Sequence, residues 1–319
     1  MAVMTYAEAA REALAEAMRA DPSVWAVGED LGRGGVFQQY KGLREEFGPD
    51  RISDAPISEA AIMGAAFGAA LVGTRPVVEM RFADFALCAT DELVNQIAKA
   101  RFMFGGQSRA PMVIRKPMGM WRSSAAQHSQ SLESWYTHIP GLVVCCPSTP
   151  QDNYSMMKAA IACDDPVVFL EHKDMWAVEG DVDRSEAYNF GKARLRAKGD
   201  DLTIVSWSKT CLEAEAAAAT LAGDGIMAEV LDLRSLWPWD KAGVLASAQR
   251  TGRILIAHES VQVGGFGAEV AATIAERSDA RVRRLGAPRS LIAYARNLED
   301  QLRVTADKIA VAAKEMLGV

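Results

Sequence analysis

The sequence has no cysteine pattern that would hold a metal ion or a set of disulfide bonds. Its 319 residues include five cysteines, an odd number, and none of them forms a C-x-x-C pair. Cys145 and Cys146 are adjacent and lie in an apolar run. This usage indicates reduced, buried thiols, and we expect a cytoplasmic protein without a zinc or disulfide framework.

The chain also lacks a large excess of positive or negative charge and a long hydrophobic run. The chain carries 35 Lys and Arg against 41 Asp and Glu, a net charge of -6, and has no basic cluster. Nucleic acid is therefore not an expected partner. The longest apolar run, residues 60–73, is too short to span a bilayer, so we expect no membrane segment. Glu8, Glu12 and Glu16 fit neither a secretory signal nor a transit peptide.

Phosphate-binding and nucleophile motifs are absent or incomplete. The sequence has no G-x-x-x-x-G-K-[ST] loop and no G-x-S-x-G elbow. Residues 264–267 (Gly-Gly-Phe-Gly) predict a helix start without the rest of a dinucleotide fingerprint. Residues 223–225 (Gly-Asp-Gly) begin like the diphosphate–magnesium motif of thiamine enzymes, but no Asn-rich continuation follows, and we interpret them as a turn. The four histidines show no metal-ligand spacing, so no metal site is expected in this chain.

Short apolar strands alternate with longer helices along most of the chain. In the first half, strands are expected at 24–27, 77–82, 112–115, 142–146 and 167–171, and helices at 5–19, 58–72, 91–104 and 151–162. A polar stretch at 179–200 has the composition of a linker. Beyond it, strands are expected at 202–207, 227–231, 254–257 and 282–285, and helices at 211–221, 267–275 and 306–316. We predict an α/β protein of two doubly wound domains, residues 1–190 and 191–319, with ligands beyond the carboxyl ends of the strands.

Glu59 opens a helix whose following residues are almost all apolar, and two interpretations of it remain open. A carboxylate at a helix N-terminus complements the helix dipole and the free N–H groups, which is a purely structural role. The same carboxylate has Ile57, Ile62 and Met63 as sequence neighbours. Desolvation among them would suit proton exchange with a bound base, which is a functional role.

His128 lies in a loop of small polar residues, 123–131, that follows an expected strand. An exposed loop histidine often has no role, yet a neutral imidazole at a strand end can transfer a proton or bind a substrate carboxylate near neutral pH. His138 is near enough in sequence to line the same pocket. His172 and His258 follow strands, and we expect them to hold hydrogen bonds at strand ends.

Gly64 and Gly68 are four residues apart on the helix that Glu59 opens, with alanines beside them. Small residues on one helix face allow another helix to approach closely. That neighbour is either a helix of another chain or an element of the same domain, and the sequence favours neither.

A set of short runs occurs in an order that resembles one known family. The runs are Gly28-Glu29-Asp30, Gly34-Gly35-Val36-Phe37, Lys41-Gly42-Leu43, Phe47-Gly48-Pro49, Glu59-Ala60 with Gly64, Phe82-Ala83-Asp84-Phe85, Gly105-Gly106-Gln107, His128-Ser129-Gln130-Ser131, His138-Ile139-Pro140-Gly141-Leu142, Asp165-Pro166-Val167 and Gly264-Gly265-Phe266-Gly267-Ala268-Glu269. Together they resemble the beta subunit of the thiamine-diphosphate-dependent, decarboxylating component of 2-oxo acid dehydrogenase complexes of the pyruvate, branched-chain and acetoin types. The resemblance implies a transketolase-like pyrimidine-binding domain followed by a transketolase C-terminal domain. It also implies an oxidoreductase that is active only with an alpha subunit, in an alpha2-beta2 heterotetramer.

The resemblance also implies roles for individual residues. Glu59 would hydrogen-bond a ring nitrogen of thiamine diphosphate and promote its reactive tautomer. Phe85 would stack on the pyrimidine ring, with Ile57 and Arg81 close by. His128 would steer the substrate or the lipoyl group that accepts the acyl product. The diphosphate and its magnesium ion would be held mainly by the alpha subunit, which explains why this chain has no motif for them.

Some residues depart from the family pattern. Arg81 stands where uncharged residues are usual, and a fixed cation there would favour an anionic substrate group. Residues 118–122 (Met-Gly-Met-Trp-Arg) are bulkier and more basic than the usual glycine-rich loop. Cys163 replaces an acidic residue in a turn where some members bind a monovalent cation, so a strong ion site is not expected. Residues 287–294 lack the expected Pro-rich, aromatic ending, which leaves docking to a lipoyl acyltransferase core in question.

Three functions therefore compete. The first is the beta half of a 2-oxo acid dehydrogenase of the pyruvate or acetoin type, which decarboxylates or cleaves its substrate and passes the acyl group to lipoyl-lysine. The second is half of a split transketolase acting on a phosphorylated or sulfonated sugar, which Arg81, Arg122 and the altered C-terminus would suit. The third is a non-catalytic α/β scaffold subunit in which Glu59 only caps a helix.

Overall fold

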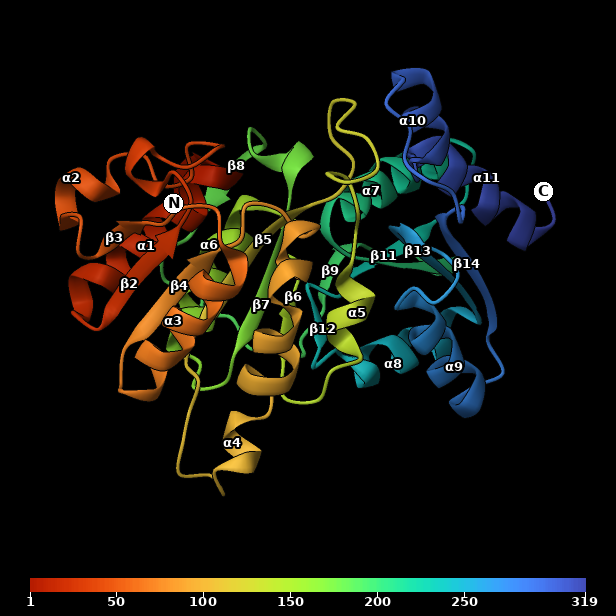
Figure 1. Cartoon of the computed structure of the whole chain (residues 1–319). Coiled ribbons are helices and arrows are strands. Elements are labelled where there is room, and N and C mark those ends of the chain that lie inside the picture. Colours follow the sequence, from red (N-terminus) through yellow and green to blue (C-terminus); the bar gives the residue numbers. More distant parts are fainter. The chain divides into compact units, whose positions relative to one another are not determined.

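The computed structural model describes residues 1–319, and they form two compact units (Figure 1). Unit 1 comprises Met1–Met118 and Trp135–Asn189, and unit 2 comprises Gly119–Ser134 and Phe190–Val319. A single cut at residue 190 would place the segment 119–134 in the first domain, whereas the structure groups it with the second. The reason is that N–H groups of this segment bind carboxylates of unit 2.

A parallel sheet forms the centre of unit 1. Its strands lie in the order β6-β7-β5-β4-β2-β3, and the paired strands run parallel. They are β2 (Val24–Gly28), β3 (Ile52–Asp54), β4 (Arg75–Glu79), β5 (Val113–Met118), β6 (Val143–Cys145) and β7 (Val167–His172). Every residue of β5 and β7 is buried, which is typical of a parallel sheet covered on both faces.

The helices of unit 1 begin at recognisable sequence signals. They are α1 (Tyr6–Ala20), α2 (Leu43–Phe47), α3 (Glu59–Leu71), α4 (Ala100–Met103) and α6 (Pro150–Ala162), with the shorter turns η1 (Leu31–Arg33), η2 (Phe85–Ala89), η3 (Glu92–Ile97) and η4 (Lys173–Met175). A capping box of Thr5 and Glu8 starts α1, and the Thr149 hydroxyl caps α6, which has Pro150 in its first turn. Helix α1 packs on α6, and α3 packs on β4.

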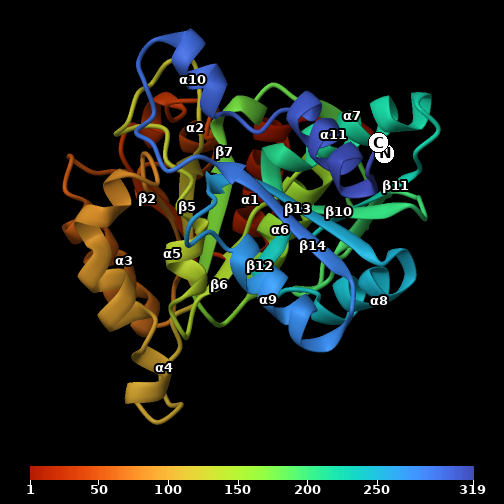
Figure 2. The same cartoon turned by 90° about the vertical axis from the view of Figure 1, so that its right-hand side faces the viewer.

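Unit 2 is built around a second sheet in the order β14-β13-β10-β11-β9. Its strands are β9 (Arg194–Ala197), β10 (Leu202–Ser206), β11 (Ala228–Asp232), β13 (Arg253–Val261) and β14 (Arg281–Ala287), and only the edge strand β9 is antiparallel to its neighbour. The helices are α7 (Ser208–Gly223), α8 (Lys241–Thr251), α9 (Gly267–Arg277), α10 (Arg296–Leu302) and α11 (Ala306–Leu317). Figure 2 shows α7 and α11 on one side of this sheet and α8 and α9 on the other. The predicted α/β class is therefore confirmed.

The structure also contains elements that the sequence does not predict. The polar stretch expected to be a linker contains β8 (Glu179–Val182) and β9, and β8 pairs antiparallel with β1 (Ala2–Thr5). The helix expected at 91–104 is instead a π-helical segment, η3, followed by the short α4. Two further short elements are α5 (Glu133–Thr137) and β12 (Ser235–Trp237). None of the helices is long and apolar enough to cross a membrane.

Candidate active site

The carboxyl ends of β2, β4 and β5 bring several polar residues of unit 1 together. The parallel register places Gly28 beside Glu79 and Glu79 beside Arg115. Gly28 has to be glycine here, because a Cβ atom would lie 2.7 Å from the carbonyl oxygen of Glu79. Glu29 and Asp30 follow β2, and Arg81 stands two residues after β4, at the edge where ligands bind in open parallel sheets.

Glu59 is the first residue of α3, and its side chain is half-buried. The preceding Ser58 makes no side-chain capping hydrogen bond to the helix. Ile62 and Met63 turn into the unit and are buried, whereas Ile57 is 76% exposed. The apolar wall expected around Glu59 is thus open on one side in this chain.

Phe85 lies at the edge of an aromatic cluster in unit 1. It follows β4, begins η2 and is half-buried. Its ring centroid is 5.8 Å from that of Phe82, which in turn packs edge-on to Phe37 at 6.3 Å. Phe37 stacks on Trp176 at 5.1 Å. The cluster fixes Phe85 from one side and leaves part of its ring accessible.

Arg81 is held by the acidic residues that follow β2. Its guanidinium lies 2.8 Å from the Asp30 carboxylate and 3.3 Å from the Glu29 carboxylate. Two carboxylates therefore compensate its charge. The expectation that Arg81 offers a fixed cation to an anionic substrate loses physical support, because its charge is already paired.

A buried network that the sequence analysis does not identify lies below these strand ends. The Glu79 carboxylate accepts hydrogen bonds from the Tyr40 hydroxyl at 3.0 Å and the Gln39 amide at 3.2 Å. Arg115 lies 3.7 Å from Glu79 and donates two hydrogen bonds of 2.8 Å to Glu171. Burial raises the pKa of Glu79 to about 7. The available signal was that Glu79, Arg115 and Glu171 stand in otherwise mainly apolar strands.

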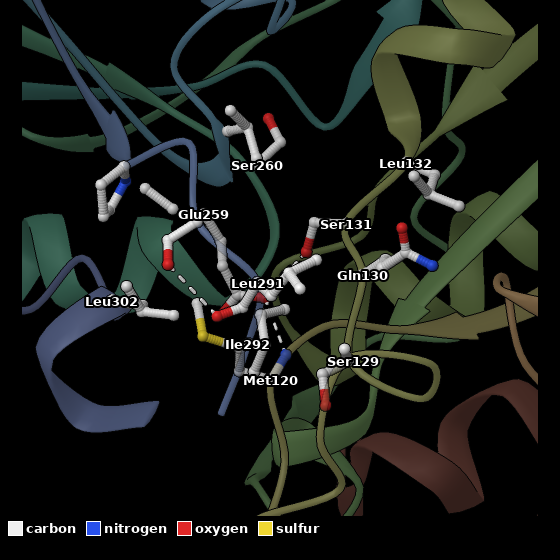
Figure 3. A pocket seen from close by; sticks show the side chains of 15 residues that line it. Met120, Ser129, Gln130, Ser131, Leu132, Glu259, Ser260, Leu291, Ile292 and Leu302 are labelled. Carbon is white, nitrogen blue, oxygen red and sulfur yellow. Dashed lines mark hydrogen bonds between the residues drawn. The ribbon is translucent and has the colours of Figure 1, made fainter. Parts of the chain in front are cut away.

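His128 lies in unit 2, in the irregular segment between β5 and α5, and is half-buried. Figure 3 shows the neighbouring Ser129, Gln130 and Ser131 beside a cavity of about 110 Å³. Of the predicted site residues, the structure thus places Ile57, Glu59, Arg81 and Phe85 in unit 1 and His128 in unit 2. His138, which was considered for the same pocket, belongs to unit 1.

Two turns considered as ion sites have other partners. Asp224 follows α7 and forms an ion pair of 2.8 Å with Lys314. Near Cys163, the Arg75 guanidinium donates to the carbonyl oxygens of Ile161 and Cys163 at 3.0 and 3.1 Å and to Asp164 at 2.7 Å. A protein cation therefore lies against these oxygens. No group of three or more His, Cys, Asp or Glu side chains is arranged to hold a metal ion.

Comparison with known proteins identifies both halves of the chain. A transketolase pyrimidine-binding domain matches residues 2–177, and a transketolase C-terminal domain matches residues 191–309. The fold is similar to that of a solved structure described as "Split gene transketolase, inactive beta4 tetramer", with a TM-score of 0.84, 24% identity and coverage of 99% of this chain and 98% of that one.

Relatives with known names match over nearly the whole chain. The 2-oxoisovalerate dehydrogenase subunit beta of Bacillus subtilis is 39% identical over 99% of both chains. The mitochondrial pyruvate dehydrogenase E1 component subunit beta-2 of Oryza sativa is 41% identical over 98% of this chain and 85% of its own. The acetoin:2,6-dichlorophenolindophenol oxidoreductase subunit beta of Cupriavidus necator is 40% identical over 97% of this chain and 96% of its own. The chain therefore belongs to the family of oxidoreductase E1 beta subunits, which combine a transketolase pyrimidine-binding domain with a transketolase C-terminal domain.

Proposed function

We propose that this chain is the beta half of a thiamine-diphosphate-dependent 2-oxo acid dehydrogenase of the pyruvate or acetoin type, acting in the cytoplasm with an alpha subunit. One observation carries the proposal: the Glu59 carboxylate stands half-exposed at the start of α3. Family membership adds support for the dehydrogenase reading over the split-transketolase and scaffold alternatives, because the named relatives are dehydrogenase or oxidoreductase subunits.

The residues of unit 1 fit one end of the coenzyme. A carboxylate (Glu59), an exposed aliphatic side chain (Ile57) and a partly accessible aromatic ring (Phe85) suit a flat heteroaromatic ring with basic nitrogens. No cluster in this chain suits a magnesium ion. In this proposal Glu59 hydrogen-bonds the pyrimidine and Phe85 stacks on it, while the diphosphate and magnesium are held mainly by the alpha subunit. When bound, the coenzyme supplies the group that reacts with the substrate carbonyl carbon.

Arg81 and His128 receive different roles. Because Asp30 and Glu29 hold Arg81, we assign it to fixing the strand ends beside the coenzyme rather than to binding an anionic substrate. His128 carries an imidazole that can form hydrogen bonds, and it would orient the substrate or the acyl-accepting lipoyl group.

The partner surface proposed for the alpha subunit includes α3. Ala60, Ala61, Ala65 and Gly68 are exposed on this helix, next to the exposed Leu71 and Val72. Small and apolar side chains on one face suit close packing with another helix, and soluble monomers rarely leave such a face uncovered. An alpha2-beta2 heterotetramer and, on the C-terminal unit, a lipoyl acyltransferase core complete the proposed assembly.

Substitution of Glu59 tests the proposal. In the reconstituted alpha-beta complex, Glu59→Gln is expected to lower turnover about a hundredfold or more, because the amide keeps the shape but cannot exchange a proton. The control is Glu269→Gln, which removes a carboxylate from the first turn of α9 in unit 2 and is expected to leave turnover unchanged. Full activity of Glu59→Gln would favour the scaffold reading.

The substrate class is tested with the same complex. Reduction of 2,6-dichlorophenolindophenol is expected with pyruvate or acetoin, and no transfer of a two-carbon unit is expected between phosphorylated or sulfonated sugars. Sugar exchange without dye reduction would establish the split-transketolase alternative and overturn the dehydrogenase assignment.

A further inference from the structure

We propose that Glu259 is a positioning residue for His128, because its carboxylate binds both ends of the loop that carries this histidine. The loop comprises residues 120–131 and is called here the His128 loop. The proposal rests on the proposed function, in which His128 acts on the substrate, and all the residues that carry it belong to unit 2.

The His128 loop has little apolar packing to hold it. Its residues from Trp121 to His128 are half-buried or exposed, and none lies in a helix or strand. The cavity of about 110 Å³ lies between the loop, the end of β13 and residues 287–292, so the loop is not packed tightly on this side (Figure 3). A loop without close packing depends on hydrogen bonds for its position.

The backbone of this loop is also strained. Arg122, Ser123 and Ala125 have φ angles of 46°, 59° and 61°, in the left-handed region that side chains other than glycine rarely adopt. Such conformations persist only where surrounding contacts impose them, and they cluster at functional sites. Some group outside the loop must therefore maintain its shape.

Glu259 contacts both ends of the loop. It stands at the carboxyl end of β13, and its Oε1 atom accepts hydrogen bonds from the Met120 N–H at 2.9 Å and the Ser131 hydroxyl at 2.8 Å. Figure 3 shows both residues converging on this carboxylate. Beside it, the Gly119 N–H donates to the Gln130 carbonyl at 3.2 Å. One carboxylate oxygen thus joins the first and the last residue of the loop.

A second carboxylate holds the strained part of the loop. Glu299 on α10 is 1% exposed, and its Oε2 atom accepts the Ser123 N–H at 2.7 Å. Arg303 donates to the other oxygen of Glu299 at 2.5 Å, which fixes the carboxylate. Hydrogen bonds to charged acceptors are stronger than those between neutral groups. Glu259 and Glu299 therefore impose one conformation on the chain that leads to His128.

The kinetic test separates positioning from simple stabilisation of the unit. In the reconstituted complex, Glu259→Ala is expected to lower kcat about tenfold to a hundredfold. Glu259→Gln keeps an oxygen acceptor and is expected to stay within about threefold of the parent. The control, Glu276→Ala, removes an exposed carboxylate from α9 in the same unit and is expected to leave kcat unchanged.

A double-variant cycle with His128 gives the decisive comparison. If Glu259 acts through His128, adding Glu259→Ala to His128→Ala lowers kcat no further. The proposal would be overturned if the fold-loss of kcat in the double variant equalled the product of the two single fold-losses. An unchanged kcat for Glu259→Ala would also overturn it.

Hydrogen exchange on the beta chain provides a readout that does not depend on activity. Glu259→Ala is expected to speed amide exchange at Met120 and Ser123 and to leave the exchange of β10 and β13 unchanged. Slow exchange in the loop of this variant would show that Glu259 does not hold it. If Glu59→Gln is fully active but the loop exchanges faster in Glu259→Ala, the proposed function fails while the loop contact stands.

Discussion

Lys116 places an unpaired ammonium group inside unit 1. The residue is fully buried on β5, its Nζ atom has no hydrogen-bond partner, and it lies 4.0 Å from the centre of the Tyr136 ring. Burial lowers the pKa of Lys116 to about 7. The pKa of Lys116 is lower in the folded state than in the unfolded state. The residue therefore lowers the free energy of unfolding most below pH 7, and this destabilisation disappears as the pH rises above about 10.5.

Lys116→Met is therefore expected to stabilise the protein. At pH 6 the gain in unfolding free energy should be roughly 2–4 kcal/mol, since an apolar side chain of similar length replaces a buried charge. The gain should shrink at pH 9. Thermal or urea unfolding at both pH values measures it, and Lys198→Met, at an exposed lysine, serves as the control. An equal gain at both pH values would contradict the argument.

His258 makes stability depend on pH in a different range. The ring is buried, stacks on Trp207 at 5.2 Å, and its Nδ1 atom lies 2.9 Å from the Ser260 hydroxyl. Two glycines lie against the ring. A Cβ atom would lie 2.6 Å from it at Gly267 and 2.7 Å from it at Gly286. Burial lowers the pKa of His258 to about 4. The folded state therefore binds the proton less readily than the unfolded state.

The sign of the effect follows from this shift. The stabilising contribution of neutral His258 is fully present above about pH 6.5 and is lost as the pH falls from about 6.5 to 4, by roughly 3 kcal/mol. Urea midpoints measured between pH 7 and pH 4.5 test the prediction. His258→Asn is expected to be less stable at pH 7 and to show a smaller loss on acidification. If acidification lowers the stability of the wild-type protein no more than that of His258→Asn, the prediction is wrong.

At the scale of elements, α3 combines a site residue with a proposed assembly surface. A Cβ atom added at Gly64 or Gly68 would meet nothing within 4 Å in this chain. Packing within the chain therefore does not require these glycines, although glycine lowers helix stability by about 1 kcal/mol relative to alanine. Contact with another helix is a physical reason to retain them.

A bulky residue at this surface should block assembly and leave the fold intact. Gly68→Leu is expected to preserve the melting temperature of the isolated beta chain and to reduce complex formation with the alpha subunit at least tenfold, because the side chain prevents close helix approach. Light scattering after co-expression measures the complex. Ala275→Leu, at an exposed position on α9, is the matched control. Normal assembly of Gly68→Leu would exclude this face as the interface.

At the scale of the whole molecule, the chain exposes apolar side chains beyond α3. Phe102 is 85% exposed and Met103 72% exposed, and Met103 borders a hollow with Leu71. Exposed apolar surface of this extent is consistent with the proposed assembly with an alpha subunit.

The isolated beta chain is accordingly expected to be inactive and to bind thiamine diphosphate at least a hundredfold more weakly than the alpha-beta complex. In the proposed function the alpha subunit holds the diphosphate and its magnesium ion, so the beta chain alone would lack the free energy of those contacts. Calorimetric titration of the beta chain, the alpha chain and the complex provides the comparison. Tight binding by the beta chain alone would refute the shared site.

The sequence by itself determined the α/β class and most of the regular elements, because a strand or helix with one buried face shows its period in a short window. It also drew attention to Glu59, since a carboxylate at the start of an apolar helix stands out without knowledge of the fold, and the role of this residue stays a prediction. The structure decided what depends on residues far apart in the chain. The pairing of β1 with β8 and of β9 with β11 places strands in the expected linker. The contacts of Glu259 and Glu299 join the His128 loop to unit 2, and Asp30 and Glu29 pair with the charge of Arg81. Local periodicity carries no information about such partners, because they meet only when the chain folds.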